Sequence, residues 1–149
     1  MGQASSLSLR LRFYDAEIAA RAIRLLVAED DPEMRRLLCE RLRRDGFEVV
    51  EASNGTQLLD YIHTHVLRPA RDEQAVDLVI SDVRMPGHTG LDVLADLRRQ
   101  DWAVPFIVIT AFGDRETYGE AQRLGAAAVF DKPFELDDLC TAVINLVAP

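Results

Sequence analysis

Several short apolar stretches of this sequence end on side chains that can take part in chemistry. They are, in chain order, the carboxylates of Glu29 and Asp30, the carboxylate of Asp82, the hydroxyl of Thr110 and the ammonium group of Lys132. A carboxylate can attack a phosphorus atom and hold the group as an acyl phosphate. Neighbouring acids can bind Mg²⁺, and an ammonium group can neutralise phosphoryl oxygens. The combination therefore suits a magnesium-assisted phosphoryl acceptor.

The chain alternates short apolar runs with helical patterns from Ile23 onward. Such alternation is typical of an α/β fold with a doubly wound parallel sheet and helices on both faces. The carboxyl ends of parallel strands lie at one edge of the sheet, where these folds place their ligand sites. We therefore expect the acids, the hydroxyl and the lysine to converge at that edge.

Capping residues and apolar spacing define the expected elements. The expected strands are Ile23–Ala28, Phe47–Val50, a run that ends at Asp82, Phe106–Thr110 and a run through Val129–Phe130. The expected helices are one with Asp31 as N-cap that stops at Gly46, one after the Asn54–Gly55 turn, one that carries Leu91, Leu94 and Leu97, one capped by Asp114 and one from Leu136 to Val147. The last helix ends near the end of the chain, so we expect no output domain after it.

Length and composition bound the class of protein. With 149 residues, of which 48% are hydrophobic, the chain suits one domain with its own core. A formal charge of −8 argues against direct binding of nucleic acid through a basic face. No apolar run approaches the roughly 20 residues of a membrane-spanning helix. Cys39 and Cys140 show no metal-like spacing, which favours a reduced, cytoplasmic setting.

Four motifs in a fixed order resemble the receiver domains of two-component response regulators. The motifs are the acidic pair Glu29–Asp30, the run S-D-V-R-M-P-G at residues 81–87, the pair Thr110–Ala111 and the tripeptide Lys132–Pro133–Phe134. The resemblance covers residues 23–147 and is closest in wording to receivers of nitrogen-regulatory activators. It implies a flavodoxin-like sheet of five parallel strands in the order 2-1-3-4-5.

The resemblance implies a role for each acid of the site. Asp82 is the expected phosphoacceptor, which attacks the phosphorus of the donor. Glu29, Asp30, Asp82 and the main-chain carbonyl of Arg84 are the expected ligands of Mg²⁺, with Asp30 bound directly and Glu29 through water. Asp31, the third acid of the triplet, is expected to cap the first helix instead.

Lys132 and Thr110 are the remaining expected members of the site. Lys132 can place its ammonium group on the phosphoryl oxygens or, before phosphorylation, on the Asp82 carboxylate. In the family the bond between this lysine and the following proline is typically cis, which holds the lysine inward. Thr110 can donate its hydroxyl to the phosphoryl group, and Ala111 leaves room for that group.

The predicted function is therefore that of a receiver which takes a phosphoryl group from a sensor histidine kinase or a histidine phosphotransfer protein. Such a protein is no enzyme in the usual sense, because it catalyses only its own phosphorylation and dephosphorylation. A phosphatase of the aspartyl-phosphate type would need a second acid two residues after Asp82, where Arg84 stands. A degenerate receiver that binds partners without phosphorylation remains the alternative, and the retained site residues speak against it.

Two features inside the domain leave questions open. Val129 occupies the position, three residues before Lys132, at which the family usually has Tyr or Phe, while Phe130 should face the opposite side of the sheet. The mechanism of the conformational switch therefore stays open, whereas the phosphorylation chemistry is retained. The first helix also carries five arginines, Arg35, Arg36, Arg41, Arg43 and Arg44, which suit either a solvated face or kinase docking.

Two segments exceed the family's usual outline. Residues 67–75 form a longer connection than most receivers have, and we expect a polar insertion there. Residues 1–22 form an extension ahead of the domain at 23–149, in which Leu7, Leu9, Leu11 and Phe13 alternate with polar side chains. Alternation of this kind predicts a half-buried strand, which would need a partner surface and could favour a homodimer. A disordered tail is the alternative.

Overall fold

The computed structural model describes residues 22–65, 75–111 and 113–148. The predicted strand within residues 7–13 lies outside these ranges. The predicted insertion at 67–75 also lies outside them, except for residue 75. Strands and helices alternate in the described residues. They are β1 (Arg24–Ala28), α2 (Pro32–Arg44), β2 (Glu48–Ala52), α3 (Gly55–His65), β3 (Leu78–Asp82), α4 (Gly90–Arg99), β4 (Phe106–Ala111), α5 (Arg115–Arg123), β5 (Ala128–Lys132) and α6 (Leu136–Val147).

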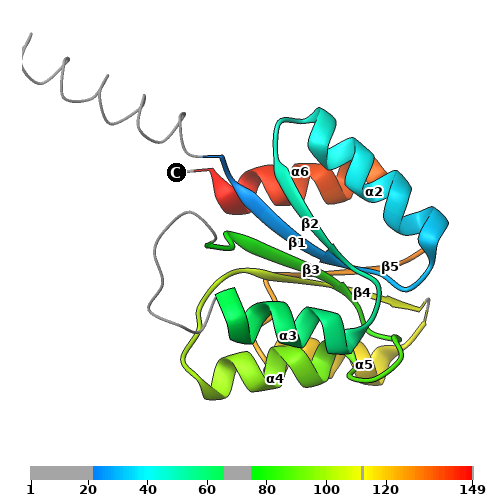
Figure 1. The fold of residues 1–149 in the computed structure, drawn as a ribbon. Coiled ribbons are helices and arrows are strands. Elements are labelled where there is room, and N and C mark those ends of the chain that lie inside the picture. Colours follow the sequence, from blue (N-terminus) through cyan, green and yellow to red (C-terminus); the bar gives the residue numbers. More distant parts are fainter. Residues whose placement is uncertain (1–21, 66–74, 112, 149) are drawn as a thin grey trace, which may run out of the picture.

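The five strands form one parallel sheet in the order β2-β1-β3-β4-β5, which confirms the predicted doubly wound α/β fold. Helices α2 and α6 cover one face of the sheet, and α3, α4 and α5 cover the other (Figure 1). The central strands β1, β3 and β4 are rich in Leu, Ile and Val and almost entirely buried. A strand covered by helices on both faces buries the side chains on both, so its apolar residues do not alternate with polar ones.

Side chains of successive strand residues enter the two halves of the core in turn. Val79 packs with α3, α4 and α5, for example, whereas Leu78 and Ile80 pack with α2 and α6. Phe106 is fully buried at the start of β4. The two apolar layers hold the sheet rigidly, so the positions of the strand ends are fixed by the core.

The caps that the sequence predicts are present. The side chain of Asp31 accepts hydrogen bonds from the amides of Glu33 and Met34, and Pro32 occupies the first position of α2. Asp114 likewise accepts a hydrogen bond from the Thr117 amide at the start of α5. These caps end the loops that follow β1 and β4 and therefore fix two of the loops at the site.

The second strand differs from its prediction. We expected Phe47–Val50, but β2 spans Glu48–Ala52. Its register explains the shift, because the Glu48 amide donates to the Ile23 carbonyl and the Ala52 carbonyl accepts from the Glu29 amide. Pairing with β1 thus decides the boundaries, and β2 reaches the same edge of the sheet as the acids that follow β1.

Candidate phosphoacceptor site

The carboxyl ends of β1, β3 and β5 bring three acids and one lysine together. Glu29 and Asp82 are 1% and 4% exposed, whereas Asp30 is exposed to solvent. One carboxylate oxygen from each acid lies within 4.8 Å of the others. Lys132, the last residue of β5, donates hydrogen bonds to Glu29 Oε1 at 3.0 Å and to Asp82 Oδ2. The structure therefore places the four charged residues where the sequence predicted.

The Asp82 carboxylate is oriented from two sides. Its Oδ2 atom accepts the hydrogen bond from Lys132, and its Oδ1 atom accepts one from the main-chain amide of Arg84 at 3.1 Å. Lys132 is itself held at the strand end, where the Lys132–Pro133 peptide bond is cis as the family resemblance implies. The orientation of the Asp82 carboxylate at the carboxyl end of β3 is thus set by one hydrogen bond to each of its oxygens.

Burial and neighbouring charge perturb the titration of two of these groups. Burial, followed by the hydrogen bond to Asp82 and its charge, raises the pKa of Glu29 to about 8, although Lys132 opposes this shift. Burial by itself would lower the pKa of Lys132, but its hydrogen bonds to Asp82 and Glu29 outweigh burial and raise it. The crowded carboxylates are therefore only partly compensated by the single ammonium group.

These residues fit a small divalent cation. The three acids offer oxygen atoms, which Mg²⁺ prefers, and their spacing lets one ion contact all of them directly or through water. A second positive charge at this place would also offset the burial and the Asp82 charge that raise the pKa of Glu29. The chemistry of the donor set thus agrees with the magnesium site expected from the sequence.

Thr110 lies beside this cluster without being bonded to it. It belongs to β4, next to β3, and is 1% exposed. Among the described residues its hydroxyl makes no hydrogen bond to Asp82, Glu29 or Lys132. Trp102 precedes the amino end of β4, which is opposite to the end that carries Thr110.

Val129 and Phe130 face opposite sides of the sheet, as predicted. Val129 packs with the core under α3, α4 and α5. Phe130 packs with the core under α2 and α6, where its ring centroid lies 6.1 Å from that of Phe134. No aromatic side chain of β5 therefore stands on the Val129 side of the sheet.

Sequence reasoning missed one residue that contacts the site. Arg35 of α2 donates a hydrogen bond from Nη1 to the main-chain carbonyl of Glu29 at 2.8 Å. We had grouped it with four other arginines as part of a basic helix. Its position four residues after the N-cap Asp31 was the available signal, because one helical turn returns a side chain toward the loop before the helix.

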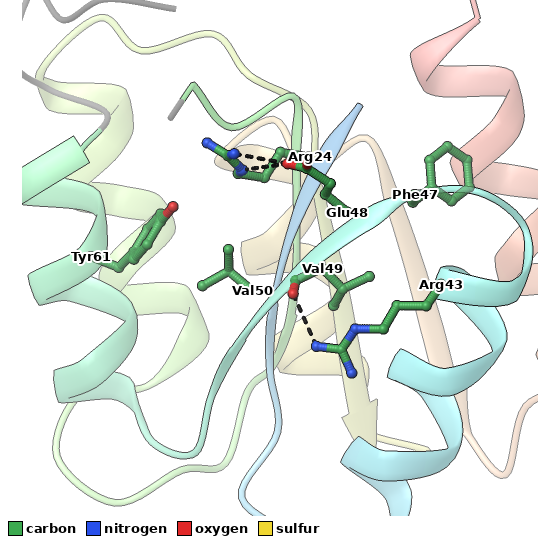
Figure 2. Close-up of a pocket in the computed structure, with 7 residues that line it drawn as sticks. All are labelled: Arg24, Arg43, Phe47, Glu48, Val49, Val50 and Tyr61. Carbon is green, nitrogen blue, oxygen red and sulfur yellow. Dashed lines mark hydrogen bonds and ion pairs between the residues drawn. The ribbon is translucent and has the colours of Figure 1, made fainter. Parts of the chain in front are cut away.

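A cavity of about 500 Å³ lies away from these residues, along the outer edge of β2 (Figure 2). It is lined by Arg24, Arg43, Phe47, Glu48, Val49, Val50 and Tyr61. None of these is a residue of the predicted site, so the size of this cavity carries no weight for the chemistry.

Comparison with known proteins identifies the class. The chain belongs to the response regulator receiver domain family, whose model matches residues 25–144. The receiver domain of Francisella response regulator 1452 superimposes with a TM-score of 0.73 at 26% identity, over 84% of this chain and 96% of that one. The family and fold predicted from the four motifs are thus confirmed.

Curated relatives differ in how much of their length the match covers. Sporulation initiation phosphotransferase F of Bacillus subtilis is 31% identical over 80% of this chain and 90% of its own length. The transcriptional regulatory protein PdtaR of Mycobacterium tuberculosis is 37% identical over 80% of this chain, which spans about half (54%) of that relative. Regulatory protein AtoC of Escherichia coli is 34% identical over 78% of this chain but only 23% of its own length.

No helix of the described part of the chain is long and apolar enough to cross a membrane.

Proposed function

We propose that this receiver accepts a phosphoryl group on Asp82 from a sensor histidine kinase or a histidine phosphotransfer protein, in the cytoplasm. The observation that carries the proposal is the arrangement of Asp82 itself. Its carboxylate is buried at the end of β3, is held by Lys132 and the Arg84 amide, and has the acids Glu29 and Asp30 beside it. A nucleophile, a counter-charge and a set of cation ligands therefore meet at one opening.

The reaction needs positioning and charge neutralisation more than acid–base chemistry. An oxygen of Asp82 forms the new bond to phosphorus, and the bond from phosphorus to the donor nitrogen breaks, so the donor's histidine leaves with its electron pair. Lys132 neutralises the phosphoryl oxygens once Asp82 has become an acyl phosphate. Thr110 is expected to donate its hydroxyl to one of these oxygens after the group has arrived.

Mg²⁺ would be held by Asp30, Asp82 and the main-chain carbonyl of Arg84, with Glu29 acting through water. When bound, it supplies positive charge against the phosphoryl oxygens. The excess of carboxylates over ammonium groups at this place supports the assignment. The chain then acts on no separate substrate and catalyses only its own phosphorylation and dephosphorylation.

Signalling would follow from a changed affinity for an output domain or partner protein. The longer relatives support this view, because the receiver forms only part of them. Because Val129 stands where the family usually has Tyr or Phe, the conformational change would not depend on an aromatic side chain at that position of β5.

The test is transfer of radioactive phosphate from acetyl phosphate or a phosphorylated kinase. We expect Asp82→Asn to abolish labelling, because an amide cannot serve as the nucleophile. Asp131→Asn, which changes an exposed acid at the same edge of the sheet, is the matched control and should be labelled normally. Undiminished, acid-stable labelling of the Asp82 variant would refute the assignment, and an unlabelled wild type would favour a degenerate receiver.

A further inference from the structure

We propose that Arg35 is a positioning residue of the metal site, which fixes the peptide group between Glu29 and Asp30 so that both carboxylates face Asp82. This inference rests on the proposed function, because it assumes that these acids bind a divalent cation. Arg35 lies in α2 and its side chain is 20% exposed. Among the described residues, it hydrogen-bonds to the main chain of the site and makes no hydrogen bond or ion pair with any of the three carboxylates.

The peptide group between the two acids is held at both ends. Its carbonyl oxygen, that of Glu29, accepts a hydrogen bond from Arg35 Nη1 at 2.8 Å. Its N–H group, that of Asp30, donates to Oε2 of the Glu29 side chain at 3.1 Å. Rotation of this peptide group would redirect the Asp30 side chain and break the second bond. The Arg35 contact therefore sets the directions of two of the three acids at once.

Arg35 is in turn held in place by the neighbouring strand. Its Nε atom pairs with Oε1 of Glu51 at 3.4 Å. Oε2 of Glu51 pairs with Nη2 of Arg43 at 3.0 Å, and the same nitrogen donates to the Val49 carbonyl at 3.0 Å (Figure 2). Two arginines of α2 thus share one carboxylate of β2, which restricts the guanidinium group of Arg35 before any ligand arrives.

Charge and position make opposite predictions for the loss of Arg35. A guanidinium group near the acids repels a divalent cation, so removal of its charge alone would tighten cation binding. Removal of its hydrogen bond releases the Glu29–Asp30 peptide group and should weaken binding. The loss of an outer contact that orients metal ligands typically costs roughly ten- to hundredfold in affinity. The sign of the change therefore distinguishes a positioning role from a merely electrostatic one.

The experiment is a titration with Mn²⁺, followed by the electron paramagnetic resonance signal of the free ion, on the full chain without phosphodonor. We expect Arg35→Met to raise the dissociation constant about tenfold. Arg36→Met is the matched control, because it removes the same charge from an exposed neighbour with no ion pair among the described residues, and it should bind as well as the wild type or slightly better. Circular dichroism at the titration temperature verifies that each variant is folded.

Arg35→Lys keeps the charge and one donor and should weaken Mn²⁺ binding less than Arg35→Met does; it also serves if the methionine variant is unfolded. The inference is overturned if the Arg35 variants bind Mn²⁺ as tightly as the wild type, or more tightly. Asp30→Asn separates this failure from that of the proposed function. If the wild type does not bind Mn²⁺, or if Asp30→Asn binds it normally, the metal site itself is refuted and the role of Arg35 falls with it.

Discussion

The residues of the site combine burial with an imbalance of charge. Glu29 and Asp82 are withdrawn from solvent, and among the described residues Lys132 is the one cation that hydrogen-bonds to their carboxylates. Burying acids without enough counter-charge destabilises the folded state, and the raised pKa of Glu29 expresses this cost. The cluster is therefore better suited to holding a cation and a phosphoryl group than to stabilising the fold.

At this scale we predict that Asp30→Ala makes phosphorylation by acetyl phosphate insensitive to Mg²⁺ and lowers its rate at millimolar Mg²⁺ by at least roughly tenfold. The remaining carboxylates would then lack the ligand expected to bind the ion directly. The measurement is the initial rate of labelling across a Mg²⁺ titration.

Asp31→Ala is the control for this prediction. It removes the N-cap of α2, where Asp31 accepts a hydrogen bond from the Glu33 amide at 2.9 Å, and should cost about 1 kcal/mol of stability. Its response to Mg²⁺ should stay normal. If Asp31→Ala lost that response while Asp30→Ala kept it, the assignment of the two acids would have to be exchanged.

The elements of the fold could be predicted to different degrees. The strand that ends at Asp82 and the caps Asp31 and Asp114 follow from local patterns, and all three are where the sequence placed them. The boundaries of β2 could not be predicted as well, because hydrogen bonds to β1 decide them. Local sequence signals thus predict the boundary of an element where a cap or a turn ends it. They do not predict the boundary where hydrogen bonds to a distant strand set it.

The same distinction applies to the site. Glu29, Asp82 and Lys132 could be predicted to meet because strand ends of a parallel sheet share one edge. The contact of Arg35 with the Glu29 carbonyl was missed, because a run of arginines does not by itself indicate which one turns toward the main chain, and only the spacing of Arg35 from the N-cap Asp31 distinguishes it. The unequal burial of Glu29 and Asp30, adjacent in sequence, likewise depends on packing that the sequence does not reveal.

A close approach between two elements yields a prediction at the element scale. A Cβ atom on Gly55, at the start of α3, would overlap the main chain of His88 in the loop between β3 and α4. The Gly55 amide also donates to the Pro86 carbonyl of that loop at 3.2 Å. We predict that Gly55→Ala displaces the loop, costs roughly 1–3 kcal/mol of stability and slows phosphorylation, because the same loop carries Arg84.

Gly119→Ala provides the comparison. Gly119 lies within α5, and an added Cβ atom would meet nothing within 4 Å. This variant should gain roughly 0.5–1 kcal/mol of stability and be phosphorylated normally. Denaturant unfolding and labelling rates of both variants check the prediction, which is wrong if Gly55→Ala is as stable and as active as the wild type.

At the scale of the whole molecule, the outer edge of β2 is a candidate surface for the extension. Arg24 at the start of β1 is in register with Glu48 at the start of β2, so the described chain begins at the end of the sheet where β2 also begins. The cavity there exposes part of Val50 and Tyr61 next to the outer edge of the strand (Figure 2). A strand with one apolar face, as predicted for residues 7–13, would suit such a surface in its own chain or in a second copy.

We predict that residues 7–13 pair as a strand and favour a homodimer independently of phosphorylation. Deletion of residues 1–20 should then convert the protein from dimer to monomer, as measured by light scattering at matched concentrations. The described domain starts at residue 22, so its fold should survive the deletion. An unchanged mass would remove the role of the extension in a dimer.

The acyl phosphate itself provides the most direct test of the central claim. Borohydride reduces an aspartyl phosphate to homoserine, so treatment of the phosphorylated chain, digestion and mass spectrometry identify the residue that carried the group. The predicted result is homoserine at position 82, present only after incubation with phosphodonor and Mg²⁺. Homoserine at Asp30 or at another acid, or none in a sample shown to be phosphorylated, would contradict the assignment of Asp82 as the phosphoacceptor.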